Sequence, residues 1–231
     1  MTRSNDFVPE KTIETGTLVL IADYGRKYGL IVEPPIPVEQ IIEAHLGLTF
    51  DFADLPRLLN DPTALGGTWF KTREVKIDES LDPDVFPANL GRYRFTVAHE
   101  IGHWELHRHH YLSADGQAAM FAGVEKPVIC RSGDWSPREW QANTFAGYLL
   151  MPTGMVLSQW EATRGTREPY VAVEEMEDLK VRWGLGEDDT PTVEVARQLA
   201  PMFEVSAQAM QIRLVGLGLI QTRKPAPRLF S

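Results

Sequence analysis

The chain has 231 residues, 43% of them hydrophobic and 24% charged, which is typical of a globular protein that buries its own core. The formal net charge of −9 argues against nonspecific nucleic-acid binding, and the single cysteine, Cys130, excludes an internal disulfide. No apolar run approaches the roughly 18 residues of a membrane span, and the start lacks a signal-peptide pattern. We therefore expect a cytoplasmic protein.

The first half of the chain is expected to combine helices with short strands. A helix is predicted from about Thr15 to Tyr28, and another over residues 38–46, where apolar side chains recur with the helical period. Residues 48–52 alternate as a strand does. The segments GGTWF and EVKIDES predict two further short strands.

The second half is predicted to be mainly helical. One helix covers about 92–107, and the segment KPVICR is a candidate strand. Ser136 and Pro137 are the N-cap and first-turn signals of a helix that runs to Leu150. Another helix is expected over 153–163, and two short helices are expected around the turn FEVSAQ.

The segment RFTVAHEIGHWELH contains the pattern H-E-x-x-H at His99, Glu100 and His103. Residues four apart on a helix share a face, with Cβ atoms about 5–6 Å apart, so both imidazoles can converge on one zinc ion. Glu100 is offset around the helix and is expected to be the base that activates zinc-bound water. The pattern predicts a zinc-dependent peptidase, with Mn2+ as the alternative cation.

A catalytic zinc needs a third protein ligand, and two residues compete for that role. His109 has the spacing of an extended motif, but Leu106 replaces the glycine that would turn the chain toward the metal. Glu139 lies near the start of the later helix, and Asn143 lies four residues on, along the same face. We favour Glu139 as the third ligand, with Asn143 as the hydrogen-bond partner of one histidine.

Three further questions stay open at this point. The oxyanion could be stabilised by His107, Tyr111, Arg138 or Tyr148. A substrate could add as a strand along GGTWF, or that strand could simply complete the sheet. Cys130 has no histidine or basic cluster near it in the sequence, and we expect it to be inert.

Together, RFTVAHEIGHWELH and EWQANTFAGYLLMP resemble the ImmA/IrrE family of zinc metallopeptidases. The resemblance extends over VEQIIEAHLGLTF, EVKIDES and LAPMFEVSAQAMQIRLVGLGLI, so it covers most of the chain from about residue 36 to 220. It implies that His99, His103 and Glu139 bind zinc and that Glu100 is the catalytic acid/base. It also implies a mostly helical α+β, gluzincin-like fold with a small antiparallel or mixed sheet.

On this basis the chain is expected to have five segments. They are an N-terminal helix and linker (1–35), a zincin-like metallopeptidase domain (36–183), a linker (184–192), a helix-turn-helix-like segment (193–221) and a flexible tail (222–231).

The resemblance also implies a class of substrate. Members of the family cleave helix-turn-helix repressors or antitoxins, which switches on stress or mobile-element genes. We therefore expect a separate protein of this class as substrate, no membrane partner and no direct nucleic-acid binding. The alternative is a non-catalytic regulator that binds a repressor through the same scaffold. The presence of Glu100 favours the enzyme, because a binding module needs no base beside a metal.

Overall fold

The computed structural model describes residues 7–112, 127–131 and 136–223. These residues form two compact units, one ending at Pro152 and the other beginning at Thr153. Within the described ranges, no helix has both the length and the apolar character that crossing a membrane requires. Most of the predicted tail, residues 224–231, lies outside the described residues.

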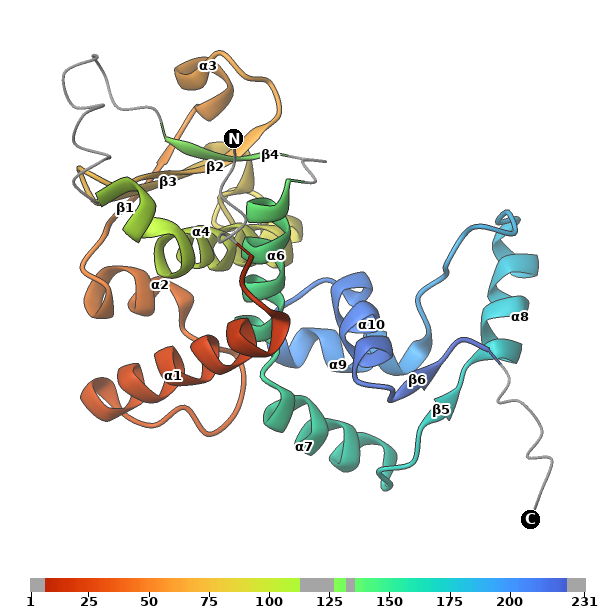
Figure 1. Cartoon of the computed structure of the whole chain (residues 1–231). Coiled ribbons are helices and arrows are strands. Elements are labelled where there is room, and N and C mark those ends of the chain that lie inside the picture. The colour runs from red at the N-terminus through yellow and green to blue at the C-terminus, as the bar shows by residue number, and fades with distance from the viewer. Residues whose placement is uncertain (1–6, 113–126, 132–135, 224–231) are drawn as a thin grey trace. The chain divides into compact units, whose positions relative to one another are not determined.

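The first unit surrounds a small sheet with helices (Figure 1). Its α-helices are α1 (Glu10–Tyr28), α2 (Val38–Gln40), α3 (Leu55–Leu59), α4 (Leu90–Leu112) and α6 (Pro137–Leu150). A π-helical segment, η1 (Ile41–His45), continues α2, and two 3-10 turns, η2 (Glu79–Leu81) and η3 (Pro87–Asn89), lead into α4.

The sheet consists of β1 (Thr49–Ala53), β2 (Ala64–Trp69), β3 (Glu74–Asp78) and β4 (Val128–Arg131), in the order β1-β3-β2-β4. The β1–β3 pair is parallel and the other two pairs are antiparallel, so the prediction of a mostly helical α+β fold with a small mixed sheet is confirmed. Because β2 pairs on both sides, GGTWF completes the sheet. The idea that a substrate adds along it is wrong.

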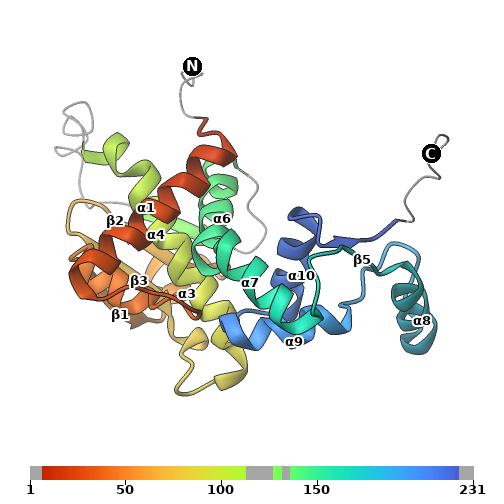
Figure 2. The same cartoon turned by 90° about the horizontal axis from the view of Figure 1, so that it is seen from below.

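Helices α4 and α6 cross at very close range. A Cβ on Gly102 would lie 3.2 Å from the backbone of Ala142 and 3.0 Å from Cβ of Phe145, so only glycine fits there without a shift. The facing residues Ala142 and Phe145 are buried. Helix α1 packs along α6 (Figure 2), and the hydroxyl of Tyr148 donates a hydrogen bond of 2.7 Å to Glu10.

The second unit contains α7 (Thr153–Arg164), α8 (Val173–Trp183), α9 (Glu194–Phe203) and α10 (Ala207–Gly216). Two short strands, β5 (Tyr170–Val171) and β6 (Ile220–Gln221), pair in parallel. Buried side chains of α7, α9 and α10, namely Trp160, Phe203 and Leu214, form much of its core. The division of the chain after Pro152 lies well before the linker predicted at 184–192.

Candidate metal centre

Helix α4 carries the H-E-x-x-H residues through the interior of the first unit. Its neighbours include β2 on one side and α6 on another, so His99, Glu100 and His103 are each at most 1% exposed. One helical turn separates the two histidines, and their ring centroids lie 4.6 Å apart. Both imidazoles therefore lie on the same face of the helix, as the spacing predicts.

Helix α6 brings a carboxylate to these imidazoles. Ser136 caps the helix, accepting a 3.3 Å hydrogen bond from the backbone N–H of Glu139, and so fixes Glu139 in the first turn. One carboxylate oxygen of Glu139 lies 3.1 Å from Nε2 of His99, and the other lies 3.2 Å from Nε2 of His103. The structure thus brings together the three predicted ligands from two helices.

The inward-facing atoms of this group fit a divalent metal ion. Among the described residues, Oε1 of Glu100 is buried without a hydrogen-bond partner, and the buried Nε2 atoms of His99 and His103 meet Glu139 at 3.1 and 3.2 Å without the geometry of a hydrogen bond. Buried polar atoms are rarely left unpaired, because each lost hydrogen bond to water costs free energy. Two imidazoles and one carboxylate form the donor set of many catalytic zinc sites, so a cation would satisfy these atoms.

The Nδ1 atoms of the two ligand histidines, on the far side of each ring, contact residues outside the ligand set. Nδ1 of His99 lies 2.9 Å from Oδ1 of Asn143, the residue predicted to support one histidine. Nδ1 of His103 lies 3.0 Å from Nδ1 of His107, and Nε2 of His107 lies 3.3 Å from Oε1 of Gln141. If each ligand histidine donates from Nδ1, its Nε2 lone pair is free for the metal.

Glu100 is positioned by β2 rather than by its own helix. The hydroxyl of Thr68 donates a 2.5 Å hydrogen bond to Oε2 of Glu100. A Cβ on Gly66 would lie only 2.5 Å from Oε1, so the glycine leaves the room that this oxygen needs. Burial raises the pKa of Glu100 to about 7, although His99 and the Thr68 hydrogen bond act in the opposite direction.

The other ionisable groups are a charged carboxylate, two neutral histidines and His99. Burial acts to lower the pKa of His99, but Cys130 and Glu139 raise it well above its ordinary value. Burial favours a protonated Glu139, but His103 and His99 outweigh it and lower the pKa of Glu139 to about 2. Burial, followed by the charge of His103, lowers the pKa of His107 to about 4. Burial also lowers the pKa of His103. A neutral imidazole is the form that binds a metal.

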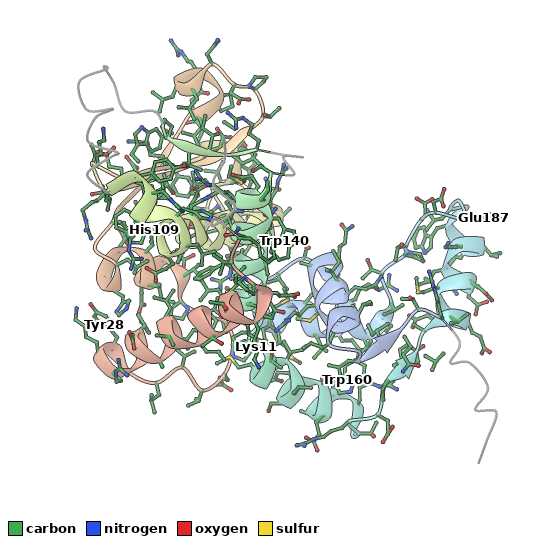
Figure 3. All side chains as sticks on the ribbon, in the orientation of Figure 1. Lys11, Tyr28, His109, Trp140, Trp160 and Glu187 are labelled. Carbon is green, nitrogen blue, oxygen red and sulfur yellow. The ribbon has the colours of Figure 1, made fainter. Side chains whose placement is uncertain are left out.

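The structure shows where the second candidate for the third ligand and the four candidates for stabilising the oxyanion lie. His109, the competing third ligand, is exposed on α4 (Figure 3), with its ring tilted by 41° against that of His110. Among the four oxyanion candidates, His107 lies behind His103, and Tyr148 binds Glu10. Arg138 instead donates a 3.1 Å hydrogen bond to the hydroxyl of Tyr111.

Cys130 lies beside the candidate ligands, which the sequence did not reveal. One ligand atom from each of His99, Cys130 and Glu139 lies within 4.8 Å of the other two. Burial raises the pKa of the Cys130 thiol, whereas His99 acts to lower it. Cys130 thus has His99 as a spatial neighbour although no histidine lies near it in the sequence, because sheet pairing brings β4 next to α4. Thr68 and Gly66, which lie beside Glu100, and Gln141, which lies beside His107, were also missed, because only the fold brings them there.

Comparison with known proteins identifies the family of the chain. The model of the IrrE N-terminal-like domain, a peptidase family, matches residues 88–215, which is more than half of the chain and includes both α4 and α6. No curated protein matched the chain. The chain belongs to the peptidase family of the IrrE N-terminal-like domain.

Proposed function

We propose that the chain is a zinc-dependent endopeptidase in which His99, His103 and Glu139 hold the metal and Glu100 is the general base. The observation that carries the proposal is the convergence of the three donor groups beside a buried carboxylate. When bound there, zinc acts as a Lewis acid that polarises the substrate carbonyl and acidifies the attacking water.

The two oxygens of Glu100 have different roles in this proposal. Oε2 is held by Thr68, whereas Oε1 has no hydrogen-bond partner among the described residues. Oε1 therefore accepts the proton of the attacking water and later gives it to the leaving amine. A pKa of about 7 suits a group that takes up and releases one proton in each turnover.

The proposed substrate is a helix-turn-helix repressor or an antitoxin, and its cleavage would switch on stress-response genes. The family resemblance supports this substrate class. The net charge of −9 agrees with a protein substrate, because a protein that binds DNA through phosphates carries a basic surface.

The test is to incubate the zinc-loaded chain with a purified helix-turn-helix regulator encoded beside its gene. The wild type is expected to produce two defined fragments, and Glu100→Gln is expected to produce none while still binding zinc. If both proteins leave the regulator intact but bind it, the non-catalytic regulator becomes the better account. Equal cleavage by both would show that Glu100 is not the base.

A further inference from the structure

The strand β4 places Cys130 on the side of the sheet that faces α4. Cys130 pairs with Gly66 of β2, next to the register shift in this antiparallel pair. Side chains of directly paired residues point to the same face of a sheet. The missing Cβ of Gly66 would point at Glu100, so Cys130 points toward the same site.

The placement of Cys130 is fixed by the surrounding structure. Its side chain is buried, 8% exposed, and forms no disulfide. The next residue, Arg131, anchors the end of β4 through an ion pair of 2.6 Å with Asp61. The pairing with β2 and this ion pair hold β4, and with it Cys130, beside the site.

The thiol meets unsatisfied metal-binding atoms rather than an apolar pocket. Its sulfur lies within 4.8 Å of ligand atoms of His99 and Glu139, a group that does not include His103. Nε2 of His99 lies 3.1 Å from Glu139, and the fully buried Oε1 of Glu100 has no hydrogen-bond partner among the described residues. Zinc readily accepts thiolate sulfur beside imidazole and carboxylate.

We propose that the Cys130 thiolate is a fourth protein ligand that closes the metal site and keeps the peptidase latent. This inference rests on the proposed function of His99, His103 and Glu139. On binding, the thiol releases its proton to solvent and its sulfur takes the coordination position that water needs. Activation reverses this exchange: sulfur leaves the metal, regains a proton, and water enters.

The chemistry of the site explains why a fourth ligand would block activity. Catalytic zinc sites have three protein ligands and one open position, whereas sites with four protein ligands are structural. With Cys130 bound, Glu100 has no water to activate. A substrate or partner that displaces β4 would open the site without any change in α4 or α6.

Cobalt substitution tests the ligand directly, because Cys130 is the only cysteine in the chain. The Co2+-loaded full chain is expected to show an intense thiolate-to-cobalt charge-transfer band in the near ultraviolet. Cys130→Ser is expected to lose this band and keep the visible bands of the bound Co2+. Identical spectra of wild type and variant would overturn the proposal.

A second measurement uses the wild type alone and so does not depend on the folding of a variant. Iodoacetamide is expected to alkylate Cys130 slowly in the zinc-loaded protein and at least about 10-fold faster after the metal is removed, because the metal occupies the sulfur lone pair that attacks the reagent. Equal rates would contradict thiol ligation. Unfolding in the metal-free protein is checked by circular dichroism.

The peptidase assay then separates the two proposals. Cys130→Ser with zinc is expected to cleave the regulator faster than wild type. If neither protein cleaves but the charge-transfer band is present, the proposed peptidase function fails and the thiol ligand stands. If both cleave at the same rate and the band is absent, the function stands and the latent state is refuted.

Discussion

Oδ1 of Asn143 on α6 lies 2.9 Å from Nδ1 of His99 on α4, so one amide joins the two helices that supply the candidate ligands. The contact holds the His99 ring with Nε2 toward the centre of the site. It also places a hydrogen-bond acceptor where the ligand histidine must carry its proton.

Asn143→Ala is expected to weaken zinc binding by roughly 10- to 100-fold, because the ring of His99 loses the partner that fixes its orientation. Competition with a chromophoric chelator measures this loss. Asn143→Asp keeps the acceptor oxygen and should retain most of the affinity. Thr144→Ala is the matched control on the same helix, since its hydroxyl bonds only the Trp140 carbonyl in the contacts described. An unchanged affinity in Asn143→Ala would contradict the supporting role.

The second ligand histidine depends on a chain of two further residues. His107→Phe removes the acceptor that lies 3.0 Å from Nδ1 of His103, and zinc affinity is expected to fall. Gln141→Leu should have a smaller effect in the same direction, because it removes the oxygen beside Nε2 of His107 and leaves the contact between His107 and His103 in place. His109→Phe, on the exposed side of α4, is the control and should bind zinc as the wild type does.

The close crossing of α4 and α6 should limit what can replace Gly102. Gly102→Ala pushes against the backbone of Ala142 at 3.2 Å, which should destabilise the protein by about 1–3 kcal/mol and shift Glu139 from the histidines. Gly147→Ala on α6 meets no atom within 4 Å and should instead stabilise the helix by up to about 1 kcal/mol. Thermal unfolding and zinc affinity check both. A loss of zinc affinity in both variants would point to the helix itself rather than the crossing.

The buried carboxyl of Glu100 makes the metal-free protein sensitive to pH. Its pKa rises from 4.5 to about 7 on folding, so the folded state holds a proton that the unfolded state releases. This contribution to stability is fully present below about pH 4.5 and is lost as the pH rises through 7. Glu100→Gln should therefore raise the melting temperature of the metal-free protein more at pH 8 than at pH 5. An equal difference at both pH values would show that Glu100 is not protonated in the folded state at pH 5.

Local sequence signals were sufficient to predict the two site helices. The histidine spacing predicts α4, and Ser136 with Pro137 predicts the start of α6. Both helices form as expected. Segments with weaker patterns were missed. No element was predicted for 173–183, where α8 forms with only Leu179 buried, or for 55–59, where α3 forms.

Contacts that depend on the sheet could not be predicted. Cys130 reaches His99 because β4 pairs with β2 through a register shift, and no local pattern specifies that shift. Thr68 reaches Glu100 from 32 residues away because β2 packs against α4. The sequence suggested His107 as a candidate for stabilising the oxyanion, but its ring lies behind His103. Helical spacing could not separate these two roles, because it places residues four apart on one face in both cases.

The central claim is that Glu139 completes the metal site with the two histidines. The most direct test is the zinc content per chain after dialysis against a weak chelator, measured by mass spectrometry in a Cys130→Ser background so that sulfur cannot substitute for the carboxylate. We expect one zinc ion in the parent and in His109→Ala, and none in Glu139→Ala. Zinc that persists in Glu139→Ala, or that disappears in His109→Ala, would contradict the ligand set.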